Sequence, residues 1–389
     1  MTHDAPTTDR DVASLIADAH STSTLLRLVG HGTWADGGRP VCAQRGLSMR
    51  AVAGIVEYVP SDLVMTVRAG TTLGEIAMAT AQHGQWLSLD PVGRDTGTIG
   101  ATIATASSGP MSLGAGTVRD LVLGLGLVSG AGTPLRVGGR VVKNVAGFDL
   151  VRLSTGAFGT LGVLTDISVR LHAKPAVDAT FVIAVDDDRD PTNLVQSLGL
   201  RALSLHALEV LDLATAARIG EGSGARWLIV ARAVGNATRV AAQCAILSTV
   251  GTVRERSSHV WALLRDEPEM SVTIRVTDAP SRLVATLNRV QAALHAGQIT
   301  TAQLRITPHR GAIRIVIPTA LRSGNAPLQQ FLETLLRSTN TGTVLGERLP
   351  ADAWALFPVA ASDSISQRIR DAFDPRRILN RGIFGEHTV

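Results

Sequence analysis

The sequence predicts an α+β protein of more than one domain, and three observations lead to this class. The chain has 389 residues, which is too long for one ordinary hydrophobic core. Up to about residue 172, short apolar runs alternate with glycine-rich turns, a pattern typical of β-rich structure. Beyond Pro175 glycine becomes sparse, and strand-like runs alternate with helical ones, as in a sheet covered by helices. Pro175 is therefore the expected start of a second domain.

The first part of the chain is expected to open with a short helix and then to form mainly strands. Thr71 or Thr72 is the expected N-cap of a second helix, with Glu75 in its first turns to complement the helix dipole. A hairpin is expected where two apolar runs flank Gly130-Ala131-Gly132. The pattern predicts helices over 9–19 and 71–83, and strands over 25–29, 47–59, 63–68, 86–89, 121–129, 133–137 and 161–171.

The second part of the chain has the apolar spacing of a sheet covered by helices. Strands are expected over 181–185, 227–233, 272–276, 304–307 and 313–317. Helices are expected over 237–247, 280–295 and 326–337, and a last helix over 362–373.

Composition argues against a nucleic-acid partner. The pI is 9.8, but the formal net charge is only +4, and lysine occurs only at Lys143 and Lys174. The other cations are arginines, which raise the pI because they do not deprotonate in its range. They are scattered, with no basic run that could follow a phosphate backbone. With 45% hydrophobic and 18% charged residues, the chain has the composition of a compact globular enzyme.

The two cysteines and the N-terminal residues indicate in which cellular compartment the protein is expected. Cys42 and Cys244 lie in different candidate domains, which excludes an iron–sulfur cluster or Cys-based zinc site built by this chain alone. The N-terminus is polar and acidic, unlike a secretory signal peptide, and no apolar run approaches the length of a membrane span. We therefore expect a cytoplasmic protein, peripheral on the inner face of the plasma membrane only through a partner.

Glycine is densest between residues 97 and 165. Such density inside β-rich sequence indicates positive φ at turns, or close approach of the backbone to a ligand. Where many bare N–H groups converge, they usually surround an anion, most often a phosphate. This region therefore predicts a nucleotide cofactor.

Four segments carry that prediction, and each has a structural alternative. Residues 30–33 (Gly-His-Gly-Thr) could hold a pyrophosphate or form an ordinary turn, and they do not match the Rossmann G-x-G-x-x-G fingerprint. Residues 91–109 are small enough to meet a diphosphate or to pack as a tight helix against a sheet. Residues 119–120 and 143–149 each hold an opposite-charge pair, which usually forms a structural salt bridge or a turn cap, and for Lys143 and Asp149 we favour that structural role. Residues 156–165 predict one of two things: a strand edge that lies against a flat ring of a ligand, or the ordinary beginning of a strand.

Together these segments resemble the FAD-binding domain of the vanillyl-alcohol oxidase/PCMH superfamily, and within it the FAD-binding subunit of bacterial glycolate oxidase (glycolate dehydrogenase). The resemblance spans about residues 20–172 and returns at 373–382; its specific part is KNVAGFDLVRL followed by GTLGVLTDISVRL. It implies a PCMH-type two-subdomain FAD-binding domain over 1–174. It also implies an α/β cap domain with a mixed or antiparallel sheet over 175–360, and a C-terminal segment, 361–389, that returns to the FAD domain.

By position, the resemblance implies a set of FAD-binding residues. Some superfamily members attach flavin to a histidine at the slot that Thr33 occupies here, whereas His31 lies two positions earlier, so FAD is expected to be non-covalent. The first pyrophosphate loop would be Gly30, His31, Gly32, Thr33 and Trp34, and the second would be lined by Pro91, Gly97, Thr98, Ile99, Gly100, Ala101 and Thr105. The rest of the cofactor would meet Gly109, Arg119, Asp120, Gly159, Gly162 and Val163.

The chain also departs from the catalytic flavin subunits of this group. They carry an H-x-G-D-G-N-x-H run in the cap, and nothing here matches it; the nearest strand ends in His309 and Arg310, a pair that is more often a surface feature than a carboxylate site. Phe158 stands where many catalytic relatives have Glu, and Arg381 replaces a proline of the closing motif. No catalytic residue and no metal site is therefore assigned.

The resemblance implies an FAD-binding subunit of a glycolate (2-hydroxyacid) oxidase complex, which oxidises glycolate to glyoxylate. Its implied partners are a catalytic flavin subunit and an iron–sulfur subunit that receives the electrons, with a small 2-hydroxyacid as the substrate of the complex. Two alternatives stay open. One is a stand-alone FAD-dependent 2-hydroxyacid dehydrogenase, and the other is a cofactor-free structural subunit.

Overall fold

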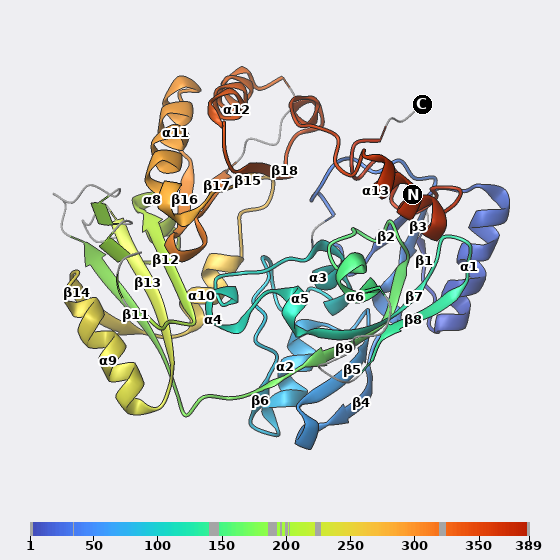
Figure 1. Ribbon diagram of the computed structural model, residues 1–389, viewed down its shortest axis with the longest axis horizontal. Coiled ribbons are helices and arrows are strands. Elements are labelled where there is room, and N and C mark those ends of the chain that lie inside the picture. Colours follow the sequence, from blue (N-terminus) through green and yellow to red (C-terminus); the bar gives the residue numbers. More distant parts are fainter. Residues whose placement is uncertain are drawn as a thin grey trace. The chain divides into compact units, whose positions relative to one another are not determined.

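Figure 1 shows a computed structural model of the chain, which describes residues 3–33, 35–139, 148–185, 193–194, 197–198, 201, 203–221, 227–318 and 324–386. Contacts between residues divide the chain into two compact units. Unit 1 comprises Met1–Gly109, Gly116–Lys174 and Val359–Val389, and unit 2 comprises Pro110–Ala115 and Pro175–Pro358. The α+β class is confirmed, since both units combine helices with sheets.

Unit 1 begins with a small parallel sheet covered by a helix. Strands β1 (His3–Asp4), β3 (Arg45–Ser48) and β2 (Leu26–Val29) pair in the order β1-β3-β2. Helix α1 (Asp9–Thr22) starts at a capping box, in which the Thr8 hydroxyl accepts from the Asp11 N–H and the Asp11 carboxylate accepts from the Thr8 N–H. Its buried residues Val12 and Ile16 pack in one cluster with Leu26 and Leu47 of the sheet.

The second sheet of unit 1 is antiparallel and has five strands in the order β4-β5-β9-β7-β8. Helices α2 (Leu73–Ala81) and α3 (Ile99–Thr105) pack on it, and their buried Ile76, Ile99 and Ile103 join one apolar cluster with the strands. The predicted hairpin is confirmed, and Thr72 caps α2 with Glu75 reaching back to it. The strands are β4 (Ile55–Val59), β5 (Val64–Arg68), β9 (Val163–Arg170), β7 (Val122–Val128) and β8 (Pro134–Gly138).

Two strand predictions in unit 1 were wrong. The run 47–59 is not one strand, because a 3-10 turn (Met49–Ala51) and Gly54, with φ of +115°, lead the chain from β3 of the first sheet into β4 of the second. The run 86–89 forms only β6 (Gln85–Trp86), paired with β10 (His172–Ala173). After Trp86 the chain bends, since the Leu89 N–H donates to the Leu87 carbonyl at 2.8 Å.

Helix α13 (Ser364–Phe373) and the residues after it also belong to unit 1. The Leu26 N–H donates to the Ile378 carbonyl at 2.8 Å, and the Asn380 N–H donates to the Leu26 carbonyl at 2.9 Å, so this segment lies along β2. Asp374 is fully buried, and its carboxylate accepts the N–H groups of Ile378 and Leu379. Two short helices complete unit 1, α5 (Val118–Leu121) and α6 (Leu150–Ser154).

Unit 2 is built on an eight-stranded sheet in which every pair is antiparallel. The strands, in sheet order, are β14 (Thr252–Arg256), β11 (Val177–Val185), β13 (Trp227–Gly235), β12 (Ala207–Asp212), β16 (Gln303–Thr307), β17 (Ala312–Ile317), β15 (Val272–Thr277) and β18 (Thr343–Arg348). The α-helices that the structure describes in this unit are α4 (Ser112–Ala115), α8 (Leu213–Arg218), α9 (Ala237–Ser248), α10 (His259–Arg265), α11 (Leu283–Ala296) and α12 (Ala326–Ser338).

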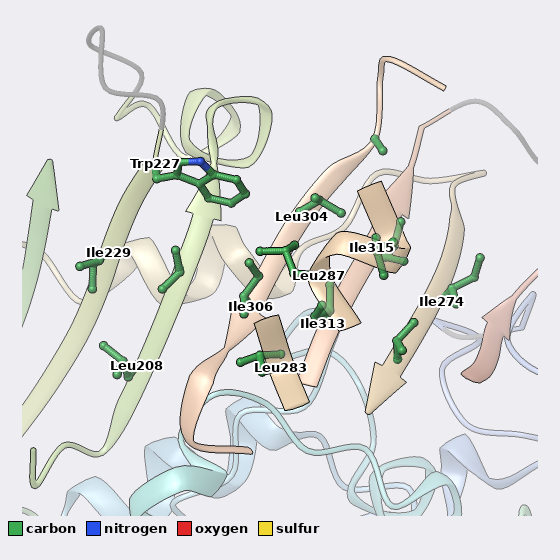
Figure 2. Close-up of a cluster of buried hydrophobic side chains, with 14 of the residues drawn as sticks. Leu208, Trp227, Ile229, Ile274, Leu283, Leu287, Leu304, Ile306, Ile313 and Ile315 are labelled. Atoms are coloured by element: carbon green, nitrogen blue, oxygen red, sulfur yellow. The ribbon is translucent and has the colours of Figure 1, made fainter. Parts of the chain in front are cut away.

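The main core of the molecule lies on one face of this sheet. Figure 2 shows apolar side chains of its strands, among them Ile306 and Ile315, beside Leu283 and Leu287 of α11. Helices α9 and α12 contribute to the same cluster, and α8 and α10 contribute to a separate one that includes Trp261. The predicted strands and helices of this part are confirmed within a few residues at their ends.

Three strands of unit 2, β12, β14 and β18, were missed by the sequence analysis. Each carries charged residues that interrupt the apolar alternation, such as Glu209 in β12 and Arg348 in β18. Both of these side chains are nonetheless buried. Across all the described ranges, each helix is too short or too polar to span a lipid bilayer.

Candidate cofactor site

The first glycine loop lies at the end of β2 in unit 1. Gly30, His31, Gly32 and Thr33 follow Val29 directly, and Gly32 has a φ of +76°, which favours glycine. Within the described part of the chain, the N–H groups of these four residues have no hydrogen-bond partner. They are therefore open donors next to one another, as an anion requires. Trp34 lies outside the described residues.

The second loop touches the first. A Cβ atom on Gly30 would overlap the hydroxyl of Thr98, and one on Gly97 would lie 3.6 Å from the Thr33 Oγ1. Thr98 itself is buried and is the N-cap of α3. The structure thus brings together four of the predicted site residues, from segments about seventy positions apart in the sequence.

Most N–H groups at the start of α3 are already used inside the protein. The Ile99 N–H donates to the Thr71 carbonyl and the Gly100 N–H donates to the Ala69 carbonyl, both at 2.9 Å. The Ala101 N–H donates to the Thr98 hydroxyl at 3.2 Å. A Cβ atom on Gly100 would come within 2.7 Å of the Ala69 carbonyl oxygen, so this glycine allows the helix to pack against the strand. The open donors of the site therefore come from the first loop.

Three other predicted residues support this arrangement from inside the protein. Pro91 is buried. A Cβ atom on Gly109 would overlap Asp90, because the backbone at Gly109 runs directly against that residue. The Thr105 hydroxyl donates to the Ala101 carbonyl at 2.8 Å within α3.

Arg119 and Asp120 also have contacts of a structural kind. The Asp120 carboxylate accepts the N–H and the hydroxyl of Thr117, both at 2.7 Å, and so caps α5. The Arg119 Nη2 donates to the Thr155 carbonyl at 3.1 Å. Asp149 caps α6 by accepting the Arg152 N–H at 3.0 Å, which fits the structural role favoured for it. Lys143 lies outside the described residues.

The fourth segment borders a small hollow of about 10 Å³ in unit 1. The hollow is lined by Ala104, Leu127, Ser154, Ala157, Gly159, Leu161, Gly162 and Leu164. Gly159 and Gly162 have φ values of +71° and +156°, and Val163 begins β9 beside them. The N–H groups of Gly156 and Phe158 donate to the Ile103 and Ala104 carbonyls at 3.0 and 2.8 Å, so this segment is joined to the end of α3.

Two residues of this region were missed by the sequence analysis. The Asn380 Nδ2 donates to the Phe158 carbonyl at 2.7 Å, and its Oδ1 accepts the Leu28 N–H at 2.8 Å, so it links the hollow to β2. Asn380 has a φ of +45°, and an asparagine before Arg-Gly is a weak signal for such a turn. The sequence around Ser154 did not indicate a role for this residue, because it stands at the end of a mostly apolar helical run.

Unit 2 holds the His309–Arg310 pair in a 3-10 turn after β16. The Arg310 Nη1 donates to the Ser112 Oγ at 2.7 Å, and Arg310 is exposed. Burial lowers the pKa of His309, and its Nδ1 has no hydrogen-bond partner among the described residues. Among those residues no cluster of His, Cys, Asp or Glu side chains is placed to hold a metal ion.

The first loop of unit 1 fits the diphosphate part of a dinucleotide. Its open N–H groups suit an anion, and they lie beside the N-terminal end of α3. The hollow at the far end of α3 has a volume of about 10 Å³, which is room for one water molecule.

Comparison with known proteins identifies the domain. Residues 4–138 match the family described as "FAD binding domain". The chain is 44% identical over 162 residues to "Glycolate oxidase subunit GlcE" of Escherichia coli (strain K12), covering 41% of this chain and 46% of that protein. It is 32% identical over 226 residues to "D-lactate dehydrogenase" of Archaeoglobus fulgidus, covering 57% and 50%. The chain thus spans about half the length of these curated relatives.

Among solved structures, p-cresol methylhydroxylase with substrate bound superimposes with a TM-score of 0.77, covering 98% of this chain and 88% of that chain at 15% identity. The class of protein follows: residues 4–138 match an FAD-binding domain, and the chain as a whole has the fold of p-cresol methylhydroxylase. Within this class, the matched stretch is similar to glycolate oxidase subunit GlcE.

Proposed function

We propose that the chain is the FAD-binding subunit of a complex that oxidises glycolate or a related 2-hydroxyacid. The observation that carries the proposal is the first loop, which lies within the stretch that matches an FAD-binding domain. Its N–H groups have no partner among the described residues, and its Gly30 lies against Thr98. The similarity to glycolate oxidase subunit GlcE supports the substrate class.

In such a complex, bound FAD would supply the acceptor for a hydride from the carbon that bears the substrate hydroxyl. The residues of unit 1 would bind and orient the cofactor. The first loop would hold the diphosphate with N–H groups, and Gly159 and Gly162 would let the backbone approach the ring. Because this chain has two cysteines, the iron–sulfur partner that receives the electrons must supply its own cluster ligands.

We place the oxidation of the substrate mainly on a separate catalytic flavin subunit. Substrate oxidation needs a base for the hydroxyl proton, and the buried carboxylates of unit 2 are committed elsewhere. Glu209 accepts the Thr307 hydroxyl at 3.0 Å, and Glu267 is paired with Arg314. His309 is the remaining candidate that the sequence indicated.

The test replaces His309 and Arg310 by Ala in the assembled complex. We expect glycolate turnover to change by less than about twofold, with FAD content unchanged, whereas removal of a catalytic base costs about 10²–10⁴-fold. A fall of the larger size at constant FAD content would place the chemistry on this chain.

The similarity to D-lactate dehydrogenase favours a second candidate, a stand-alone 2-hydroxyacid dehydrogenase. The purified chain should first show flavin absorbance, at about 450 nm. Anaerobic addition of glycolate or D-lactate then separates the two functions. Bleaching of the flavin by the chain alone supports the stand-alone enzyme, and bleaching only with the partner subunits supports the subunit.

A further inference from the structure

Helix α13 of unit 1 exposes apolar surface at its N-terminal end. All ten residues of this helix are described, and Arg370 is the only buried one, whereas Ile365 in the first turn is 61% exposed. A surface helix normally turns its apolar residues toward the core of its own domain, as α11 does with Leu287 and Val290. Packing within unit 1 therefore does not explain the exposure of Ile365.

The residues before α13 extend this apolar surface. Val359 is 39% exposed, and Ala360 and Ala361 are also exposed. The Gln367 Nε2 donates to the Ala361 carbonyl at 3.1 Å, which holds this run against the helix. Single exposed apolar residues are normal, whereas a contiguous patch with a polar rim marks an interaction site. We call Val359, Ala360, Ala361 and Ile365 the α13 surface.

Positive charge without an acidic partner lies beside the α13 surface. Arg368 follows Ile365 by three residues, so the two lie on one side of the helix. The Arg368 guanidinium donates to the Ser364 carbonyl at 3.4 Å and forms no ion pair with the described residues. Arg381 also forms no ion pair in the described ranges, and it lies near the same helix, because its charge acts on Arg370.

The exposed acidic residues of this segment are already engaged. Asp363 caps α13 by accepting the N–H groups of Ile365 and Ser366. Asp371 pairs with Arg377 at 2.8 Å. The surroundings of the α13 surface thus keep uncompensated positive charge, and a partner that presents acidic side chains would complement it.

The α13 surface is connected to the candidate cofactor site. The Ala360 N–H donates to the Phe384 carbonyl at 2.8 Å. The Phe384 and Phe158 rings meet edge to face, with centroids 5.9 Å apart. Phe158 belongs to the fourth glycine segment, and its N–H donates to the Ala104 carbonyl at the end of α3. A short path through two aromatic rings therefore joins the surface to the segment predicted to meet the flavin.

We propose that the α13 surface docks an acidic face of the subunit that receives electrons from FAD. The inference rests on the proposed function, since it needs a flavin in unit 1 and a partner that accepts its electrons. An electron acceptor must dock close to the flavin, because electron transfer slows steeply with distance. Electron-transfer contacts are also small, below about 1,200 Å² of total buried area, so a compact surface suffices.

Two other occupants fit these observations less well. A second copy of the chain would bring two positively charged surfaces together. Anionic membranes are bound through clusters of about four to eight Lys or Arg residues, or by helices with bulky Trp, Phe and Leu residues. Arg368 and Arg381 are too few for such a cluster, and most of the α13 surface consists of alanine and valine.

The test measures the dissociation constant of the electron-accepting subunit by dilution of the assembled complex. We expect Ile365→Asp to raise this constant by at least about tenfold, because a carboxylate would be buried at the contact. The helix should tolerate the substitution, since an acidic residue in the first turn complements the helix dipole. Arg368→Glu should raise the constant by about three- to tenfold, mainly through slower association, and should reduce its dependence on salt. FAD content should stay unchanged in both variants.

Two exposed residues outside α13 provide matched controls. Met78→Asp introduces the same carboxylate at a side chain that is 67% exposed in α2 of unit 1. Arg254→Glu reverses an exposed charge on β14 of unit 2. Both controls should leave the dissociation constant unchanged.

Unchanged binding in both α13 variants would overturn the proposal, and so would equal losses in the controls. Binding of the chain to phosphatidylglycerol vesicles that Ile365→Asp abolishes would assign the surface to a membrane instead. A change from dimer to monomer in the same variant would assign it to a second copy. If the unsubstituted chain assembled with no electron-accepting subunit, the proposed function itself would fail, and the inference with it.

Discussion

Two sites, one in each unit, treat polar groups in opposite ways. In unit 2 the buried charges satisfy one another: Arg314 donates to Glu267 and, at 2.6 Å, to Glu347, while Glu347 also pairs with Arg275 at 3.1 Å. In unit 1 the first loop presents open N–H groups, and Ser154 keeps a buried hydroxyl without a partner in the described ranges. Groups that are satisfied internally stabilise a fold, whereas groups left open are available to a ligand.

Electrostatics sharpen this difference. Burial alone would raise the pKa of Glu267, but the charge and hydrogen bonds of Arg314 outweigh it and hold the pKa below its ordinary value. Burial would likewise lower the pKa of Arg314, and the two carboxylates raise it instead. Both groups therefore stay charged, and the cluster in unit 2 is a closed structural network.

The largest effect is expected from breaking that network. Arg314→Met leaves Glu267 as an uncompensated buried charge, so we expect the free energy of unfolding to fall by about 3–5 kcal/mol. Urea denaturation measures this loss. The double variant Glu267→Met, Arg314→Met should recover most of the loss, because replacing a buried ion pair by apolar residues of similar volume is often neutral. An equal loss in the double variant would mean that the loss does not come from the unpaired charge of Glu267.

A smaller effect is expected from adding one methyl group beside the hollow. Gly159→Ala should cost about 1–2 kcal/mol of backbone strain and should also crowd Leu28. We further expect FAD affinity to fall by roughly tenfold, the equivalent of about 1.4 kcal/mol. The measurement is a fluorescence titration of the apoprotein with FAD.

Gly220→Ala in unit 2 is the matched control, since Gly220 has a φ of +79° and open space around its Cβ position. It should bear a similar strain and keep full FAD affinity. If both variants lost affinity equally, the effect would be one of stability and the role assigned to Gly159 would fail.

The smallest effect concerns pH. Burial, with a contribution from the charge of Arg170, lowers the pKa of His172, whose Nδ1 lies 2.8 Å from the Ser88 Oγ. The unfolded chain thus binds a proton more readily than the folded one, and stability is full above the ordinary histidine pKa of 6.5 and declines as the pH falls below it. His172→Asn should reduce this decline in urea midpoints measured between about pH 5 and 8. A slope identical to that of the unsubstituted protein would contradict the prediction.

Much of unit 1 could be predicted from local sequence signals. The hairpin around Gly130-Ala131-Gly132 and the N-cap Thr72 with Glu75 depend on residues within a few positions of one another. The strand β12 could not be predicted, because Glu209 breaks its alternation and is buried only through partners such as Thr307 on a distant strand. The use of the N–H groups at the start of α3 was equally invisible, since their acceptors lie near residue 70.

The sequence by itself predicted a nucleotide site in the glycine segments and determined their turns, because glycine density, turn chemistry and motif spacing are local properties. Tertiary structure alone decided which donors stay open. The contact between Gly30 and Thr98 positions the first loop. The packing of Gly100 on Ala69 brings N–H groups of α3 to acceptors inside the protein. The surroundings of Ser154 leave its hydroxyl without a hydrogen-bond partner in the described chain. The physical reason is that satisfaction of a polar group depends on atoms brought close by folding, not on its neighbours in the chain.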